Sequence, residues 1–271
     1  MIKIIGFDMD DTLLDDDKNI PDLDAVKKAI DNGVKVVLCS GRPFSNVTKK
    51  YYDLLEMDEG YFCGYNGAVV YDIKTKDVVY ENSLDSNELF FIMDVATKGL
   101  KQIGHYDDAA LCIHYDKTVY TNRRNKYIDL DISINKTELV ITDELVNDSR
   151  KAHKFTIDAD PAIIQKLSQV ITPVLENQFN IMISSPHFLE FIRKDASKYT
   201  GLLEIAKMYG FSEDEIMTFG DSMNDYELIK HAYLSIAMGN SMEEIKLIAK
   251  DVTDTNHNHG IKKALEKYGI I

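Results

Sequence analysis

The sequence predicts an α/β protein whose doubly wound, Rossmann-like parallel sheet is interrupted by an inserted α+β domain. Three observations predict it: a βαβαβ order of elements over the first 80 residues, a change after them to short alternating apolar runs with two helical stretches, and a return of alternating strands and helices after residue 195. Strands that alternate with helices imply a parallel sheet with right-handed crossovers. The most economical division assigns residues 1–82 and 193–271 to the core and residues 83–192 to the insert.

The core elements are predicted from apolar runs and from the residues that bound them. The first strand is a short run rich in Ile and Phe, which is typical of a buried parallel strand. Apolar residues at helical spacing follow, and Gly33 suits the end of that helix. Pro43 suits the first turn of the second helix, and Asn66-Gly67 predicts a tight turn between two strands. In order, the predicted strands are 2–7, 34–38, 61–64, 68–71, 215–219, 234–237 and 251–253, and the predicted helices are 21–32, 43–55, 198–209, 225–231, 242–249 and 260–268.

The insert combines two helical stretches with short alternating apolar runs. This texture is typical of an α+β domain rather than of further βαβ units. The predicted helices of the insert are 86–100 and 161–175, and its predicted strands are 109–115, 118–121, 139–141, 154–158, 180–184 and 188–193.

Composition excludes several classes of partner. The 271 residues include 31 Lys and Arg against 45 Asp and Glu, a formal net charge of −14. We therefore expect neither nucleic acid nor an anionic membrane as a partner, since both need a basic face. No apolar run approaches the roughly 18–20 residues of a membrane span, and the N-terminus reaches Asp8 too soon for a signal peptide. Three scattered cysteines, Cys39, Cys63 and Cys112, fit buried thiols in a reducing cytoplasm.

Acidic and polar clusters follow three predicted strands, at residues 8–12, 40–41 and 220–225. In open α/β sheets, ligands bind beyond the carboxyl ends of the strands, where the strand order reverses. Carboxylates that converge there repel one another and raise each other's pKa unless a cation is present. Hard oxygen ligands with room for water and phosphate suit Mg²⁺ better than a transition metal.

Simpler explanations account for less of this pattern. If Asp8 and Asp10 were only turn formers, neither their spacing nor the distant Asp221 would be explained. A calcium loop that starts at Asp8 needs Gly at its sixth position and Glu at its twelfth, where the chain has Leu13 and Asn19. The glycine patterns of dinucleotide-binding loops and P-loops are absent from the sequence.

Lys198 opens the helix that follows the insert. Alone, a lysine at that position is most simply a charge that faces solvent. Beside a cluster of carboxylates and a metal, it becomes a candidate phosphate clamp, because its ammonium group is a point charge matched to a dianion.

Taken together and in this order, these segments resemble the four motifs of the haloacid dehalogenase superfamily. The similarity is closest to Cof-type phosphatases, which carry a large α/β cap between the second and third motifs, and it extends over essentially the whole chain. The segments that carry it are residues 8–14, 40–42, Lys198 and 220–225, and further segments similar to sugar-phosphatase members are 65–68 and 188–191, which includes Glu190.

The resemblance implies a Mg²⁺-dependent phosphatase that acts on small phosphorylated metabolites, with sugar phosphates as the expected class. Asp8 would be the nucleophile that forms an aspartyl-phosphate. Asp10 would protonate the leaving alkoxide and later activate water, a task that a raised pKa would suit. Mg²⁺ would be held by the carboxylates of Asp8 and Asp221 and by the backbone carbonyl of Asp10.

The resemblance also assigns phosphate-binding roles. The Ser40 side chain and the backbone N–H groups of Met9 and Gly41 would hold the transferring oxygens, while Lys198 and Asn224 would add contacts from the other side. Phosphoryl transfer depends mostly on such positioning and charge neutralisation.

Supporting residues and one departure from the family complete the expected site. Thr12 and Asp225 would contact the metal ligands rather than the metal itself. Arg42 and Asn66 are candidates for substrate contacts, with a salt bridge as the alternative role of Arg42 and a turn as the alternative role of Asn66. The family usually has Gly where this chain has Asp11, and Asp adopts the left-handed region less readily than Gly.

Other functions are compatible with parts of this pattern. A phospho-accepting regulatory module uses Asp clusters, a Ser or Thr and a Lys on a parallel sheet, but it normally needs about half this length. A catalytically silent phosphometabolite sensor is a third hypothesis, which Asp11 makes conceivable. A phosphomutase would differ only in the group that receives the phosphoryl group. Nothing in the pattern indicates an oligomeric state.

Overall fold

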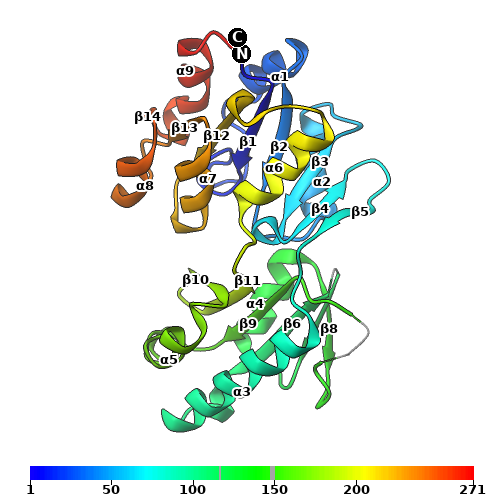
Figure 1. Cartoon of the computed structure of the whole chain (residues 1–271), viewed down its shortest axis with the longest axis vertical. Helices are drawn as coiled ribbons and strands as arrows, with labels where there is room; N and C mark the ends of the chain where they lie inside the picture. Colours follow the sequence, from blue (N-terminus) through cyan, green and yellow to red (C-terminus); the bar gives the residue numbers. More distant parts are fainter. Residues whose placement is uncertain (116, 147–149) are drawn as a thin grey trace. The chain divides into compact units, whose positions relative to one another are not determined.

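A computed structural model (Figure 1) describes residues 1–115, 117–146 and 150–271, apart from the side chains of residues 46 and 47. The chain forms two compact units, residues 1–80 with 197–271 and residues 81–196. The insert proposed from the sequence, 83–192, lies inside the second unit. Among the described residues, no helix is long and apolar enough to cross a membrane.

The first unit is built on an eight-stranded sheet with the order β14-β13-β12-β1-β2-β3-β4-β5. Every neighbouring pair from β14 to β3 is parallel, and β3 pairs with β4 in antiparallel fashion. This confirms the predicted α/β fold with a doubly wound sheet. The strands are β1 (Ile4–Asp8), β2 (Lys35–Cys39), β3 (Tyr61–Gly64), β4 (Val69–Asp72), β5 (Val78–Glu81), β12 (Ile216–Gly220), β13 (Leu234–Ala237) and β14 (Asp251–Val252).

The direction of winding reverses between β1 and β12. From β1 the chain proceeds outward to β2 and β3, whereas from β12 it proceeds outward on the other side to β13 and β14. Asp8 is the last residue of β1, and Asp221 directly follows β12. Crevices at such reversal points are where open α/β sheets bind ligands. The fold therefore places two of the predicted site residues at its expected binding edge.

Helices α6 and α7 pack against each other in front of the parallel strands in Figure 1. Leu202 and Ile205 of α6 belong to one buried cluster with Ile4 and Val37 of the sheet. The helices of this unit are α1 (Leu23–Asp31), α2 (Asn46–Leu54), α6 (Lys198–Met208), α7 (Tyr226–His231), α8 (Glu243–Ile248) and α9 (Gly260–Lys267).

The turn predicted at Asn66-Gly67 joins β3 to β4. Tyr65, Asn66 and Gly67 all adopt positive φ angles, of 49°, 54° and 90°, which explains why this pair favours a hairpin connection. The second helix begins at Asn46, after Pro43 rather than at it. Strand β5 was not predicted, because it is a largely exposed edge strand.

Gly67 fixes the start of α6. A Cβ atom on Gly67 would lie 1.8 Å from the Ser197 carbonyl oxygen. Ser197 caps α6 in a capping box with Thr200, so that Lys198 is the first residue of the helix. The close approach of the β3–β4 turn to Ser197 thus sets where Lys198 enters the sheet edge.

The second unit has a six-stranded, mostly antiparallel sheet with the order β10-β11-β9-β6-β7-β8. Helices α3 and α5 pack together and share a buried cluster with one face of this sheet. Helix α4 was not predicted. The elements are α3 (Ser86–Gln102), β6 (Ala110–Tyr115), β7 (Thr118–Thr121), α4 (Lys126–Asn135), β8 (Glu138–Ile141), β9 (Lys154–Asp158), α5 (Pro161–Leu175), β10 (Phe179–Ser185) and β11 (Phe188–Arg193).

All three cysteines are buried and none forms a disulfide. Burial raises the pKa of Cys112, and for Cys39 a hydrogen bond with Cys63 and burial both raise the thiol pKa. Both effects favour the neutral thiol, so these groups behave as small apolar side chains. The prediction of buried thiols is confirmed.

We expect Gly67→Ala to destabilise the fold by more than about 3 kcal/mol, because the new methyl group combines a positive φ with a clash against Ser197. Gly210→Ala is the matched control, since Gly210 has a φ of +74° and nothing within 4 Å of the position that a Cβ atom would occupy. Its cost should be about 1–2 kcal/mol. Urea unfolding measures the change in the free energy of unfolding for both variants. Equal destabilisation by the two substitutions would show that the close approach of Gly67 to Ser197 is unimportant.

Candidate active site

The loop that follows β1 holds Asp8 in a tight backbone arrangement. The Leu13 N–H donates to the Asp8 carbonyl at 3.2 Å and the Leu14 N–H to the Met9 carbonyl at 2.9 Å. Both the Asp8 side chain and Met9 are buried. Asp11 has a φ of +62°, so this chain carries Asp in a left-handed conformation at the position where the resemblance places Gly.

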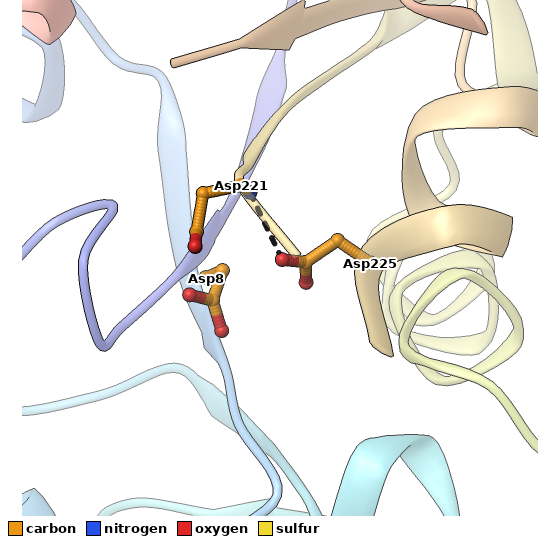
Figure 2. Close-up of side chains that lie close together, drawn as sticks. All are labelled: Asp8, Asp221 and Asp225. Atoms are coloured by element: carbon orange, nitrogen blue, oxygen red, sulfur yellow. Dashed lines mark hydrogen bonds between the residues drawn. The ribbon is translucent and has the colours of Figure 1, made fainter. Parts of the chain in front are cut away.

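Three carboxylates meet at the sheet edge (Figure 2). Oxygen atoms of Asp8, Asp221 and Asp225 all lie within 4.8 Å of one another, and all three side chains are buried. Asp8 comes from the end of β1, and the other two come from the segment after β12. The predicted convergence of Asp8 and Asp221 is therefore present in the structure.

Lys198 is buried among these carboxylates. Its side chain has 0% exposure, and its Nζ lies 2.5 Å from Asp8 Oδ1 and 2.7 Å from Asp225 Oδ1. Burial would lower the pKa of Lys198, but Asp225 and Asp8 outweigh burial and raise it. The lysine is therefore a permanent cation, and it binds the predicted nucleophile directly.

One lysine does not balance three carboxylates. Burial and Asp225 raise the pKa of Asp8 well above its ordinary value despite the contact with Lys198. Burial and Asp225 likewise raise the pKa of Asp221 to about 6. Ionised carboxylates this close need additional positive charge. A divalent cation with oxygen ligands fits this donor set, and Mg²⁺ and Ca²⁺ are the hard cations of that kind.

Asp225 differs from its two neighbours because both of its side-chain oxygens accept hydrogen bonds from protein donors. Its Oδ1 accepts from Lys198, and its Oδ2 accepts from the backbone N–H groups of Asp221 at 3.0 Å and Ser222 at 3.2 Å. Figure 2 shows the contact with Asp221 as a dashed line. Thr12 Oγ1 donates to Asp221 Oδ1 at 2.8 Å. Asp225 and Thr12 thus hold the lysine and Asp221, which leaves Asp8 and Asp221 as the ligand candidates.

Asp10 does not have the raised pKa that would suit a general acid. Arg42 donates to both Asp10 oxygens, at 3.0 and 2.9 Å, and Lys18 Nζ donates to Asp10 Oδ1 at 2.9 Å. Partial burial would raise the pKa of Asp10, but Arg42 and Lys18 outweigh burial and lower it. The carboxyl group of Asp10 is therefore ionised at neutral pH. Of the two roles considered for Arg42, the structure shows the salt bridge.

The remaining predicted residues lie around the ends of β2 and β3. Ser40 is buried, and its Oγ accepts from the Arg42 N–H at 3.2 Å. The Asn66 N–H donates to the Ser40 carbonyl, and Asn224 Nδ2 lies 3.4 Å from Asn66 Oδ1. A Cβ on Gly41 would lie 3.1 Å from the Asn66 amide. Asn66 is thus a turn residue whose side chain also packs against Gly41 and reaches Asn224.

The sequence-based reasoning missed two residues that hold the loop after β1. Lys18 lies beyond an acidic run that is typical of a solvated loop, and nothing in its spacing indicates a contact with Asp10. Asn240 Nδ2 donates to the Asp11 carbonyl at 2.7 Å, across most of the length of the chain. The position of Asn240 after Gly239, three residues beyond a predicted strand that ends at residue 237, is the one sequence signal that could have suggested this contact.

A family model matches the sequence that builds this site. The model of haloacid dehalogenase-like hydrolases aligns with residues 5–265, and the aligned stretch includes both acidic loops and Lys198. The chain belongs to the haloacid dehalogenase-like hydrolases. This confirms the resemblance stated from the motifs.

Relatives in this hydrolase family match over the full chain. The Bacillus subtilis protein named "Putative phosphatase YxeH" is 31% identical over 275 residues, which cover 98% of each chain. The 5-amino-6-(5-phospho-D-ribitylamino)uracil phosphatase YitU of Bacillus subtilis is 28% identical over 273 residues, 98% of this chain and 97% of its own. The structure of a sugar phosphatase of subclass IIB, BT4131, superposes with a TM-score of 0.79 over 99% of this chain and 100% of its own, at 22% identity. The chain is therefore a phosphatase of the haloacid dehalogenase-like family.

We expect Mg²⁺ to stabilise the protein more at about pH 7 than at about pH 5. Since the folded-state pKa of Asp221 is about 6 and that of Asp8 is also raised, the metal-free fold loses stability as the pH rises from the unfolded carboxyl pKa of about 4 through these values. A bound cation favours the ionised forms and offsets that loss, whereas protons compete with it at the lower pH. The lowered pKa of Asp10 has the opposite effect on stability, because it stabilises the fold when the carboxyl group is ionised. That stabilisation is fully present above about pH 4 and is lost as the pH falls further.

Thermal unfolding with and without Mg²⁺ at the two pH values measures the effect. Asp221→Asn is the control, and its melting temperature should respond little to Mg²⁺ at either pH. An equal Mg²⁺-induced shift of the wild-type protein at both pH values would contradict the expectation.

Proposed function

We propose that the protein is a Mg²⁺-dependent phosphatase that hydrolyses small phosphorylated metabolites through an aspartyl-phosphate on Asp8. The observation that carries the proposal is the buried group of Asp8, Asp221 and Lys198 at the reversal point of the sheet. The proposed nucleophile, its lysine counter-ion and the proposed second metal ligand come from three distant segments of the chain.

Asp8 would supply the attacking oxygen. One carboxylate oxygen forms a bond to phosphorus while the bond from phosphorus to the ester oxygen breaks, and the released alkoxide takes a proton. Water then attacks phosphorus, the aspartyl bond breaks, and inorganic phosphate leaves. Lys198 neutralises part of the negative charge on Asp8 throughout, since its Nζ contacts Asp8 in the resting protein.

Mg²⁺, held by Asp8 and Asp221, would offset the repulsion between the Asp8 carboxylate and the incoming phosphate. The Asp10 carbonyl stays a predicted third ligand. Phosphate oxygens would be bound by Ser40, by the backbone N–H groups of Met9 and Gly41, and by Asn224.

The lowered pKa of Asp10 divides its proposed acid and base roles. As an ionised carboxylate, it is ready to accept a proton from the attacking water. To protonate the leaving alkoxide in the first half-reaction, it must first bind a proton, which its contacts with Arg42 and Lys18 oppose. An anionic substrate that draws Arg42 toward itself would remove the strongest of these contacts and raise the proton affinity of Asp10.

Sugar and polyol phosphates are the substrate class we propose. Two relatives support it by their names: one acts on a phosphorylated ribityl chain, and the other is a sugar phosphatase of the same fold. Both names describe a phosphate monoester on a carbon chain that bears hydroxyl groups. The acidic net charge of the chain is consistent with a small metabolite rather than a nucleic acid as its substrate.

The test is turnover of p-nitrophenyl phosphate with and without Mg²⁺, followed by a panel of sugar and polyol phosphates. Wild-type protein should turn over the ester only with Mg²⁺, and Asp8→Asn should abolish turnover because no nucleophile remains. Asp10→Asn should retain phosphate binding but lose about 10²–10⁴-fold in turnover, because the proton transfers lose their acid and base. Asp16→Asn, an exposed acid farther along the same loop, is the control and should match wild type.

Other outcomes select the other functions. A stable phosphoprotein without turnover would indicate a phospho-accepting regulator, and binding without turnover would indicate a sensor. Transfer of the phosphoryl group to a second sugar would indicate a phosphomutase. Near-wild-type rates in Asp10→Asn would mean that the proton is handled by another group.

A further inference from the structure

One short loop contacts the backbone of both acidic segments. It consists of residues 239–242, which connect β13 to α8, and is called the 239–242 loop. Asn240 Nδ2 donates to the Asp11 carbonyl at 2.7 Å, in the segment that follows Asp8. On the other side, Ser241 Oγ donates to the Gly220 carbonyl at 3.1 Å and the Met242 N–H donates to the Asp221 carbonyl at 2.9 Å. The loop therefore bridges the two segments that carry the carboxylates.

Asn240 is itself held in place by Asn256. The Asn256 N–H donates to Asn240 Oδ1 at 3.1 Å. Asn256 is buried, and its Nδ2 donates to the Leu14 carbonyl at 3.0 Å. Two asparagine amides thus hold the loop after β1 at two carbonyl groups, those of Asp11 and Leu14. A second, independent part of the chain fixes the orientation of the Asn240 amide.

The carboxylates that these contacts hold repel each other. Asp8 and Asp221 belong to a buried group whose oxygens lie within 4.8 Å, and the buried Lys198 contacts Asp8 but not Asp221 in any ion pair of the described residues. Repulsion favours a wider separation of the two loops. The contacts of Asn240, Ser241 and Met242 oppose that movement from outside the acidic group.

We propose that Asn240 is a positioning residue that sets the separation of the Asp8 and Asp221 carboxylates and thereby the affinity of the site for a divalent cation. The inference rests on the metal site of the proposed function, and it adds a residue that touches neither the substrate nor the cation. A pair of ligands held at the right separation before the cation arrives binds it more tightly, because less rearrangement is needed on binding.

Asp11 gives this contact particular weight in this chain. Its φ of +62° lies in the left-handed region, which an Asp adopts less readily than a Gly. The carbonyl that Asn240 binds belongs to this same residue. The contact therefore helps to hold a backbone conformation that the side chain at this position disfavours.

The test is the dissociation constant of Mg²⁺, measured by titration calorimetry on the metal-free full-length protein, with Asn240→Ala. Partners that orient metal ligands typically contribute about 10–100-fold to metal affinity, so we expect the dissociation constant to rise by at least about tenfold. Because Asn240 is exposed, the melting temperature of the metal-free protein should change by no more than about 2 °C. The rate of p-nitrophenyl phosphate turnover should recover largely when Mg²⁺ is raised to saturation.

Two further variants separate positioning from other effects. Asn258→Ala is the matched control, since Asn258 is an exposed asparagine nearby that donates to Asp254 Oδ2 at 2.7 Å, and it makes no hydrogen bond to the loop after β1 among those of the described residues. It should leave the Mg²⁺ affinity unchanged. Asn240→Asp keeps the acceptor for Asn256 but places an oxygen against the Asp11 carbonyl. Added negative charge alone would tighten Mg²⁺ binding, whereas loss of the contact would weaken it, and we expect weaker binding.

Each outcome decides the inference. It is overturned if the Mg²⁺ dissociation constant of Asn240→Ala rises by less than about tenfold while Asp221→Asn loses binding, since residues that orient metal ligands typically change the affinity by about 10–100-fold. It is also overturned if the wild-type protein does not bind Mg²⁺. If the wild-type protein binds Mg²⁺ without turning over any phosphate ester, the proposed function fails, but the comparison of dissociation constants still supports or refutes the role of Asn240.

Discussion

The contact on which the site depends is the buried ammonium group of Lys198 between Asp8 and Asp225. A fully buried lysine is stable only with close counter-charges, and here both lie within 2.7 Å. The contact joins the first strand of the chain to the helix that follows the second unit, so the return of the chain to the sheet is coupled to the assembly of the acidic group. Gly67 allows the β3–β4 turn to approach Ser197, the residue just before Lys198. This close approach fixes the position of Lys198 beside the end of β1.

The elements that were predicted from the sequence are those that a few neighbouring residues specify, such as an apolar run, helical spacing or a turn pair. The buried strand β1 and the helix α5 follow from continuous apolar runs and helical spacing, and the Asn66-Gly67 turn follows from its need for positive φ angles. Helix α4 was missed because the buried Asp131 interrupts its apolar face, although its Asn125 cap is a usable start signal. Strand β5 was missed because its side chains are exposed and carry no apolar alternation.

The same distinction applies to the site. Asp8 and Asp221 were identified because a strand end is a local feature and the sheet topology brings such ends together. The lowered pKa of Asp10 was not predicted, because it depends on Lys18 and Arg42, whose loop conformations no periodicity encodes. Asn240 was missed for a related reason: its partner is a backbone carbonyl, and every residue has one. Contacts between loops are thus the part of the site that pattern reasoning did not reach.

Two aspartates only two positions apart have pKa values shifted in opposite directions, and their neighbours explain the difference. Asp8 is buried among carboxylates, whereas Asp10 is partly exposed and contacts two cations. Proton affinities that differ in this way allow neighbouring carboxyl groups to take different tasks. Positive charge therefore lies beside the partly exposed carboxylate of Asp10, and excess negative charge lies in the buried group around Asp8. Under the proposed function, an anionic substrate would be attracted to Arg42 and Lys18, while Asp8 would need a bound cation before it could accept the phosphate.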